Sequence, residues 1–550
     1  MRRITNLVTV EELKCLYLHP RIYLKSFFVK FRHLRISLVT NFTSMKLPLF
    51  HLSIVFISIM VSCSVFAQEE KKEETKPIPE PKNFITFHQG TFGGKLMKYK
   101  ATAGEMHLKN KKDEPSASIW SVAYTAEGAD QSVRPVTFVF NGGPGSASVW
   151  LHMGLFGPLI TKVDSDAKSD DGAAPYSLLQ NNYGLLDLTD LVFIDPVGTG
   201  YSIVIGKGKV EDYWGLTEDA RSIAQFMRQW ITKNKRWNSP KYIAGESFGT
   251  TRAAGVASVL EEDGQEMSLN GLILISQALD YSGSTSDLDN ITSYLTYLPS
   301  MAATAWYHQK AGSGKTLEQF TDEARKFAWN EYAPALYKGS HLPTDQKKQI
   351  AQRLSYFTGL PQSYVELSNL RILIPRFRKE LLRDKGLTLG QLDGRYTGKE
   401  SDEAAERPTI GDAASYSIGS AYTAALNHYL ATKLTVEMDR PYLTSNSELG
   451  SKWRWRDVPE GTYWEPVYIT VGRKLGDAMR RNKDLKVMVA SGYYDLVTPF
   501  FDAEYTFSHF GILPEQVQMT YYEAGHMMYL HEPDLVKLTA DIRAFLASKK

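Results

Sequence analysis

Short apolar runs alternate with amphipathic segments along residues 84–278, and the same pattern returns after residue 485. Near-continuous apolar strands that alternate with helices indicate a mostly parallel sheet with helices on both faces. The helical patterns include residues 218–235 and 250–264. We therefore predict an α/β fold. The runs with the length and residue types of β-strands are residues 117–126, 134–143, 190–198, 240–247, 269–276, 485–492 and 517–525.

The alternation of strands and helices stops over residues 279–484. This stretch is instead helical and rich in Tyr, Trp and Gln. One helix start is well marked, because Thr316 and Gln319 have the spacing of a capping box. Since the sheet pattern resumes at residue 485, we predict a mainly helical cap insertion between two parts of one core, residues 84–278 and 485–550.

Residues 1–67 differ from the rest of the chain in charge and hydropathy. They carry nine basic and two acidic side chains, so the remaining residues have a net charge of −5 although the whole chain has +2. An apolar run after Lys46 that ends at Ala67 is typical of a secretory signal peptide over residues 45–67. We predict Met45 as the true start, export to the periplasm or the extracellular space, and a flexible linker over residues 68–83.

Two alternatives to signal cleavage stay open. About 20 apolar residues could span a bilayer as an anchor, and Cys63 could carry a lipid. Both cysteines, Cys15 and Cys63, precede the predicted cleavage site, so the mature chain would contain no disulfide. We expect no stable membrane span after cleavage. We also expect no nucleic-acid partner, because the mature chain lacks the basic excess of nucleic-acid-binding proteins.

The stretch KYIAGESFGTTRAAG, residues 241–255, places Gly-x-Ser-x-Gly between an apolar strand and a small-residue helix. This order is that of a nucleophile elbow, in which a sharp turn exposes a serine hydroxyl above the sheet. Gly245 and Gly249 let the backbone turn tightly there. Ser247 would stand at a helix N-terminus, where the helix dipole favours developing negative charge. We predict that Ser247 is a catalytic nucleophile.

A serine nucleophile needs a base, and the base needs a third group to orient it. In this kind of fold the chain order is serine, acid, histidine, with each residue after a strand. Asp495 follows the run VMVASG, and His526 follows the run MTYYEAG. Alone, these residues would be a turn aspartate and a core histidine, but with Ser247 they predict a triad. Other histidines lack a position at a strand end: His308, His341, His428 and His531.

Stabilising the oxyanion of acyl transfer requires two backbone N–H groups that point at one position. One is expected from Phe248, the residue after the nucleophile. The other is expected from a glycine-rich loop after an earlier strand. The loop NGGPG, residues 141–145, follows the strand TFVF and fits that requirement.

The chain resembles the serine carboxypeptidase family of the α/β-hydrolase fold, from about residue 90 to 550 and least clearly across the cap. The motifs that carry the resemblance occur in order: NGGPGSAS (141–148), PVGTGYS (196–202), GESFG (245–249), SGYYD (491–495) and GHMM (525–528). The chain would be a bacterial-looking, disulfide-free member.

The resemblance also implies roles for individual residues. Ser247 would be the nucleophile, and Asp495 and His526 its partners. The N–H groups of Gly143 and Phe248 would form the oxyanion hole. Asn141 and Glu246 would bind the free C-terminal carboxylate of a peptide.

One departure from the family pattern bears on substrate choice. A second Glu of the family, which shares a proton with the first, is replaced by Leu155. Two carboxylates in one site raise one pKa strongly, and Leu155 removes that effect. A lone ionised Glu246 would repel a substrate carboxylate, unless burial keeps Glu246 protonated or His152 or Arg252 supplies a positive charge.

We expect no cofactor and no metal. The stretch AGSGKT, residues 311–316, resembles a phosphate-binding loop, but Gln309 occupies the position of its first glycine and no apolar strand precedes it. His526 and His531 are close in sequence, but His526 is assigned to the triad and no further ligand cluster has zinc-site spacing.

These patterns favour an exported serine-type carboxypeptidase that releases C-terminal residues from peptides through an acyl-enzyme. The alternative is a triad esterase, amidase or acyltransferase that acts on a small acyl substrate without a strict need for a free carboxylate. A non-catalytic binding module is the third hypothesis, and the intact triad and oxyanion loop argue against it.

Overall fold

The structure, a computed structural model, describes residues 76–163, 166–167, 172–262, 264–456 and 468–548. The predicted signal peptide over residues 45–67 and the alternative lipid site at Cys63 lie outside these residues, as does the first part of the predicted linker. Within the described ranges, no helix is long and apolar enough to cross a membrane.

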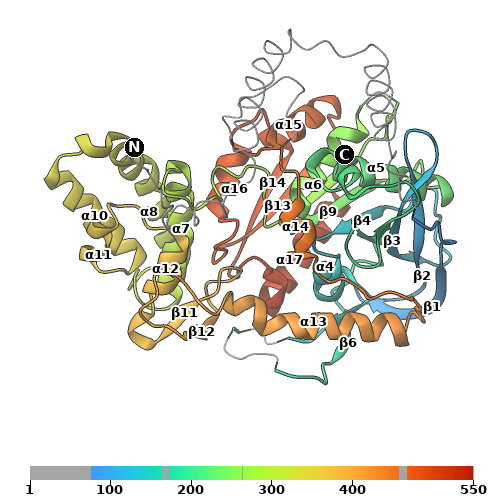
Figure 1. Cartoon of the computed structure of the whole chain (residues 1–550), viewed down its shortest axis with the longest axis horizontal. Coiled ribbons are helices and arrows are strands. Elements are labelled where there is room, and N and C mark those ends of the chain that lie inside the picture. Colours follow the sequence, from blue (N-terminus) through green and yellow to red (C-terminus); the bar gives the residue numbers. More distant parts are fainter. Residues whose placement is uncertain (1–75, 164–165, 168–171, 263, 457–467, 549–550) are drawn as a thin grey trace, which may run out of the picture. The chain divides into compact units, whose positions relative to one another are not determined.

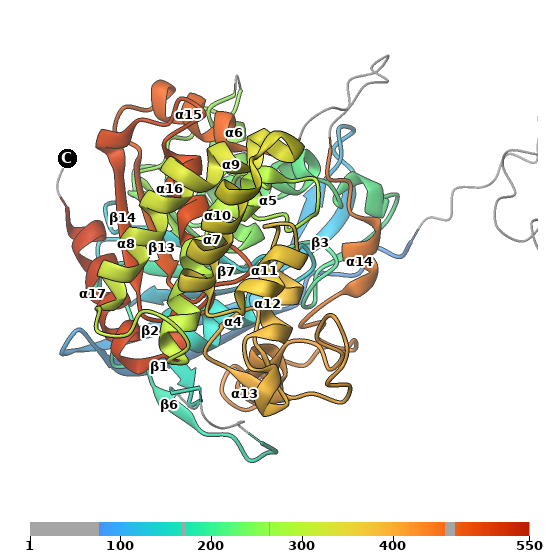
Figure 2. The ribbon, with the colours of Figure 1, turned by 90° about the vertical axis from the view of Figure 1, so that its left-hand side faces the viewer.

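A ten-stranded sheet lies at the centre of the described region (Figures 1 and 2), in the order β1–β2–β3–β7–β4–β9–β10–β13–β14 with β8 paired to β3. From β7 to β14 all neighbours are parallel, and from β1 to β7 all are antiparallel. Every strand that the apolar runs predict is present, and the α/β prediction is confirmed. The bounds are β1 (Asn83–Phe92), β2 (Lys95–Lys109), β3 (Pro115–Ala126), β4 (Val136–Phe140), β7 (Asp190–Asp195), β8 (Ile203–Val204), β9 (Lys241–Glu246), β10 (Gly271–Ile275), β13 (Lys486–Gly492) and β14 (Val517–Tyr522).

Strands β1 and β2 are not predicted by the apolar pattern. In β1, exposed and more buried residues alternate, and the exposed positions include the apolar side chains of Ile85 and Phe87. An antiparallel strand with one solvated face gives a mixed pattern, whereas a strand covered on both faces gives a continuous apolar run. The edge of the sheet is therefore harder to recognise from sequence than its centre.

Helices cover both faces of the sheet and form a separate core on each. In β10, Leu272 and Leu274 point into one core and Ile273 and Ile275 into the other, as the two-residue period of a strand requires. The first core contains residues of α5 (Leu216–Lys233), α6 (Phe248–Leu260), α15 (Gly472–Arg481) and α16 (Phe500–Phe507). The second contains residues of α4 (Val149–Leu151), η2 (His152–Phe156), α13 (Ala413–Thr432), η8 (Met528–Leu530) and α17 (Glu532–Ala547).

The chain leaves the sheet after β10 and rejoins it at β13, and the segment between them is mainly helical. Several of its helices gather at the left of Figure 1 and form a third core that also includes Tyr494 and Leu496 of the loop after β13. The elements before α13 are α7 (Ile291–Tyr307), α8 (Leu317–Phe327), η4 (Ala328–Tyr332), α9 (Ala333–Lys338), η5 (Gly339–His341), α10 (Thr344–Thr358), α11 (Gln362–Leu367), α12 (Ile374–Glu380), η6 (Arg383–Lys385), β11 (Leu387–Leu389) and β12 (Thr397–Lys399). Helix α14 (Ser447–Lys452) follows α13.

The capping box that the sequence predicts is present at the start of α8. The Thr316 hydroxyl accepts a hydrogen bond from Gln319 N, and the Gln319 side chain accepts one from Thr316 N. The helical run that follows is not one continuous α-helix, because a π-helical turn, η4, separates α8 from α9. Short elements elsewhere are β5 (Leu159–Thr161), β6 (Leu178–Gln180), η3 (Val210–Asp212) and η7 (Pro514–Gln516).

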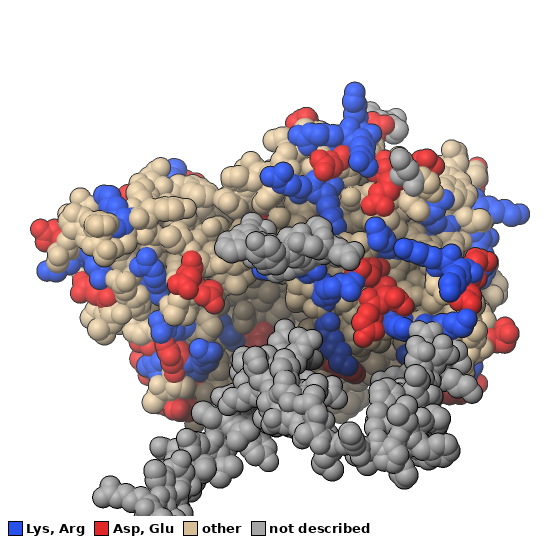
Figure 3. Space-filling view, turned by 45° about the horizontal axis from the view of Figure 1, so that its top comes forward, with Lys and Arg blue, Asp and Glu red and all other residues tan. Residues whose placement is uncertain are grey.

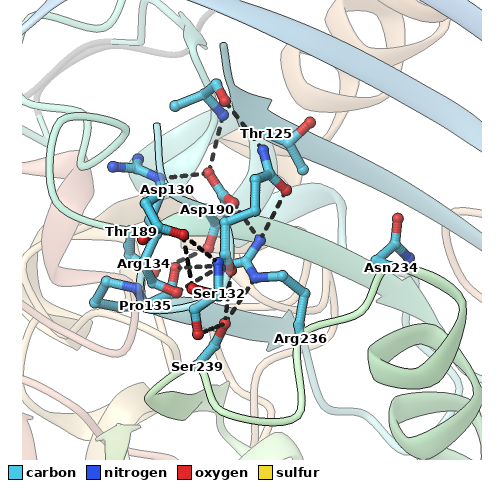
Figure 4. Close-up of polar contacts among 12 residues, drawn as sticks. Thr125, Asp130, Ser132, Arg134, Pro135, Thr189, Asp190, Asn234, Arg236 and Ser239 are labelled. Atoms are coloured by element: carbon cyan, nitrogen blue, oxygen red, sulfur yellow. Dashed lines mark hydrogen bonds and ion pairs between the residues drawn. The ribbon is translucent and has the colours of Figure 1, made fainter. Parts of the chain in front are cut away.

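A buried ion cluster lies at the amino ends of β4 and β7 (Figure 4). Asp190 accepts from Arg134 Nε at 2.7 Å, from an Arg236 guanidinium nitrogen at 2.6 Å and from Ala126 N at 2.9 Å. The side chains of Asp190 and Arg236 are fully buried. By contrast, the face in Figure 3 shows basic and acidic side chains interspersed over the surface. The ion cluster holds the amino ends of β4 and β7 together. Ser247 lies at the other end of the sheet, directly after β9.

Candidate active site

Ser247 occupies the sharp turn between β9 and α6. Its backbone has φ 59° and ψ −130°, a conformation that residues with a side chain rarely adopt. Two hydrogen bonds hold the turn, from Ser247 N to Ile275 O at 3.0 Å and from Thr250 N to Ser247 O at 2.8 Å. The side chain is the N-cap of α6 but makes no capping hydrogen bond. The hydroxyl therefore lies at the carboxyl end of the sheet without a capping contact.

His526 and Asp495 lie in the loops after β14 and β13, and their side chains are in contact. His526 Nδ1 is 2.7 Å from Asp495 Oδ2, and both side chains are buried. Because a carboxylate only accepts, Nδ1 carries the proton and Nε2 is left as the basic nitrogen. Burial alone lowers the pKa of His526, but the charge and hydrogen bond of Asp495 outweigh it and raise the pKa above its usual value.

Asp495 is held in place by the loop that follows it. Its Oδ1 accepts from Val497 N at 2.8 Å and Thr498 N at 2.9 Å, and its Oδ2 accepts from the Thr498 hydroxyl at 2.7 Å. In the described part of the chain, no hydrogen bond joins Ser247 Oγ to the His526 imidazole. Such bonds are often long without substrate and tighten on binding.

The glycine-rich loop after β4 lies directly against the elbow. A Cβ on Gly142 would come within 2.5 Å of Phe248 N, so only a glycine permits this approach. Among the described residues, no protein acceptor takes the N–H of Gly143 or of Phe248. Two uncommitted donors close to the serine match the needs of an oxyanion site.

Glu246 is buried, 4% exposed, and its two carboxyl oxygens meet only neutral partners. Asn141 Nδ2 donates to Oε1 at 3.1 Å, and the Tyr529 hydroxyl donates to Oε2 at 2.6 Å. Burial is the largest influence and raises the pKa of Glu246 to about 7, against the opposing effects of His526, Tyr529 and Asn141. Glu246 is therefore protonated at mildly acidic pH.

Neither His152 nor Arg252 supplies the positive charge that could compensate an ionised Glu246. His152 is buried beside Tyr124, whose hydroxyl lies 2.7 Å from its Nε2, and burial lowers the pKa of His152 to about 3. Arg252 forms a buried ion pair with Asp219 at 2.6 Å. Of the alternatives for Glu246, burial that keeps it protonated is the one that the structure favours.

Leu155 and Tyr529 show what the sequence could and could not reveal about this site. Leu155, on the η2 turn, is buried in the second core and offers no side-chain polar group. Tyr529, on η8, supplies the hydrogen bond to Glu246 and has no role in the sequence prediction. It lies three residues after His526, and that spacing was its only signal.

The other motifs lie apart from this site. The turn over residues 311–316 connects α7 to α8, where Lys315 pairs with Glu323. His531 pairs with Asp534 at 2.6 Å at the start of α17. No group of three or more His, Cys, Asp or Glu side chains in the described ranges could hold a metal ion.

Comparison with known proteins identifies a family. The sequence model of the family described as serine carboxypeptidase matches residues 96–377, which is just over half of the chain. The matched range contains Asn141, Gly143 and the elbow. It ends before Asp495 and His526, whose pairing is seen only in the structure.

Among curated proteins, the chain is similar to serine carboxypeptidase-like 16 of Arabidopsis thaliana, with 26% identity over 154 residues, 27% of this chain and 34% of the relative. It is also similar to the pheromone-processing carboxypeptidase kex1 of Aspergillus terreus, with 28% identity over 159 residues, 28% of this chain. The alignments thus cover 34% of the Arabidopsis relative and 23% of the Aspergillus relative.

Among solved structures, the chain is similar to Kex1(Δ)p, a prohormone-processing carboxypeptidase of Saccharomyces cerevisiae. The TM-score is 0.50 at 15% identity, and the match covers 81% of this chain and 92% of that chain. At this identity the likeness shows the fold, which is that of an α/β-hydrolase.

Proposed function

The chain belongs to the serine carboxypeptidase family, and from this premise we propose that it is a serine hydrolase that removes C-terminal residues from peptides. The observation that carries the proposal is the environment of Glu246. A carboxyl group that is buried among neutral donors and has a raised pKa can donate a hydrogen bond to a substrate carboxylate instead of repelling it.

The proposed reaction uses the triad in the usual order of acyl transfer. Ser247 Oγ attacks the scissile carbonyl while His526 Nε2 takes its proton. Asp495 keeps the imidazole in the required tautomer and stabilises its cation. The N–H groups of Gly143 and Phe248 bind the oxyanion, His526 protonates the leaving amine, and water then hydrolyses the acyl-enzyme.

Substrate binding at the other side of the scissile bond would use Asn141 and Glu246. Asn141 is fixed by three contacts: its Oδ1 accepts from Leu151 N at 3.0 Å, its backbone oxygen accepts from Arg252, and its Nδ2 donates to Glu246. Because Glu246 directly precedes Ser247, a carboxylate held there would lie next to the reacting carbonyl. This geometry favours cleavage of the last peptide bond.

The first test is the variant Ser247→Ala treated with a fluorophosphonate probe, with the wild type as the control. We expect the wild type to be labelled and the variant to be neither labelled nor active. Labelling of the variant would show that the nucleophile is another residue.

The second test compares a blocked dipeptide as its free acid, amide and methyl ester. We expect a preference for the free acid that declines as the pH rises through about 7, where Glu246 loses its proton. Equal rates on acid and amide would instead support the alternative function, a triad esterase, amidase or acyltransferase.

Export completes the proposal and rests on the sequence of residues 45–67. We propose a bacterial-type, disulfide-free enzyme that is cleaved after Ala67 and released to the periplasm or the extracellular space. Mass spectrometry of the N-terminus should find Gln68 first. Peptides from residues 1–44, or a lipid on Cys63, would contradict this part.

A further inference from the structure

The hairpin of β11 and β12 belongs to the helical insertion, yet its tip reaches the loops that carry His526 and Asp495. The tip is residues 390–396, closed by a hydrogen bond from Gly390 N to Tyr396 O at 2.8 Å. No sequence motif marks this segment, and the proposed reaction assigns it no role.

The tip holds the histidine loop by two consecutive backbone groups. His526 N donates to Leu392 O at 2.6 Å, and Gly525 N donates to the Asp393 carboxylate at 3.0 Å. A Cβ on Gly525 would come within 2.5 Å of Leu392 O, so a glycine is needed for the two segments to lie this close. The backbone of His526 is therefore fixed directly by the insertion.

The same tip holds the loop of Asp495 from both sides. Leu496 N donates to Gln391 O at 3.0 Å, and Gly394 N donates to Tyr494 O at 2.9 Å. These two contacts flank Asp495 in the chain. One short segment thus fixes both loops whose side chains must meet at 2.7 Å.

Two carboxylates keep the tip in shape. Asp393 is buried and pairs with Arg395, whose guanidinium lies 5.5 Å from the centre of the Tyr494 ring. Asp412, the N-cap of α13, accepts from Gln391 N at 2.7 Å and from Leu392 N at 3.2 Å. The tip is thereby tied to α13 on one side and to the two catalytic loops on the other.

We propose that residues 390–396 set the relative position of His526 and Asp495, with Asp393 and Asp412 as positioning residues. The proposal rests on the proposed function only in taking His526 as the base. A displacement of about 1 Å in such a pair can reduce the rate about 100-fold, although no contact with substrate is lost.

Asp412 also acts on His526 through its charge. The acidic groups that raise the pKa of His526 are Asp495, Glu246 and Asp412, against burial, which lowers it. Removing the charge of Asp412 lowers the pKa of His526. Since the neutral imidazole is the base, activity should then persist to lower pH.

The experiment compares Asp393→Ala, Asp393→Asn and Asp412→Asn with wild type on one ester substrate. We expect Asp393→Ala to lower kcat about 100-fold with KM within about twofold, and to slow fluorophosphonate labelling in parallel. Asp393→Asn should retain more activity, because its side-chain oxygen can still accept from Gly525 N. Asp412→Asn should move the acid limb of the kcat/KM profile to lower pH.

Glu400→Gln is the matched control, because Glu400 pairs with Lys379 in the same insertion at 3.0 Å but is not at the tip. It should lower the melting temperature and leave kcat per labelled site unchanged.

A wild-type kcat in Asp393→Ala together with an inactive Ser247→Ala would overturn the positioning role alone. An active Ser247→Ala would overturn the proposed function instead. If Asp393→Ala does not fold, wild-type values in the other two variants would overturn the proposal.

Discussion

The two ends of the central sheet each bury a carboxylate, and they treat it in opposite ways. At the amino end, Asp190 is paired with Arg134 and Arg236. At the carboxyl end, Glu246 meets only the neutral groups of Asn141 and Tyr529. Burial raises the pKa of Glu246 to about 7. Both carboxylates are buried, so burial alone does not distinguish them.

Under the proposed function, the difference separates an end that supports stability from an end that supports chemistry. A buried charge that is fully paired gives a fixed protonation state and a rigid contact, and it is costly only when one partner is removed. A buried carboxyl that is hydrogen-bonded only to neutral groups destabilises the folded state once it ionises, but it titrates near neutral pH. Changes at the amino end should therefore lower stability without altering the rate, and changes at the carboxyl end should alter activity and the pH dependence of stability.

The largest effect is expected for Asp495→Asn. Asparagine keeps the shape but leaves His526 in the wrong tautomer, which should lower kcat about 10⁴-fold. The folded state should persist, with a far-ultraviolet circular dichroism spectrum like that of wild type. Steady-state kinetics on an ester would check the rate, and a loss below tenfold would remove Asp495 from the proposed triad.

Asp190→Ala tests the amino end of the sheet, where the effect should be on stability. The variant leaves two buried guanidinium groups without a carboxylate, so the free energy of unfolding should fall by about 3–5 kcal/mol. Urea unfolding would measure this. The rate per phosphonate-labelled site should stay at the wild-type value. An unchanged unfolding midpoint would show that the cluster does not stabilise the fold.

Glu246→Gln should remove the part of the pH dependence of stability that comes from Glu246. The folded-state pKa of Glu246 lies above the usual value, so the native state holds an extra proton and wild-type stability falls as the pH rises from about 4.5 to about 7. The variant lacks this loss, so its stability relative to wild type should rise by up to about 3 kcal/mol across that window.

The activity of Glu246→Gln gives an independent check. Because glutamine cannot ionise, the ratio of free-acid to ester turnover should no longer depend on pH. Urea unfolding and kinetics at several pH values would measure both effects. A pH-dependent ratio that survives in the variant would assign the titration to another group.

Tyr529→Phe is the mildest of these changes. It removes the hydrogen bond that favours ionised Glu246, so the pKa of Glu246 should rise and the decline of free-acid turnover should move up by about one pH unit. Tyr429→Phe, which loses a buried hydroxyl that contacts Tyr124, is the control. An identical shift in both variants would show that the effect is not specific to Tyr529.

The sequence predicts those parts of the fold and site that depend on local patterns. The central strands are apolar over their whole length, and Ser247 and the NGGPG loop are marked by residue types that a sharp turn requires. Membership of the family and the α/β fold are confirmed. The triad assignment stays a prediction, supported by the contact between His526 and Asp495.

What the sequence does not predict depends on contacts between distant segments. Tyr529 becomes a partner of Glu246 only because η8 packs beside the elbow, and its position three residues after His526 is the only signal in the sequence. The tip over residues 390–396 has the composition of an ordinary turn, and its contacts with His526 and with the two neighbours of Asp495 join residues 100 or more positions apart in sequence. The apolar pattern does not predict β1 and β2, because their half-exposed faces blur it.

The insertion between β10 and β13 has a consequence for the order of assembly during synthesis. A chain that has been made as far as β10 already contains Ser247 and the NGGPG loop, but neither Asp495 nor His526. The loop that carries Asp495 contributes Tyr494 and Leu496 to the core of the insertion. Contacts of such long sequence separation are slow to form. A newly made chain would therefore lack the contact between His526 and Asp495 until its last strand has joined the sheet.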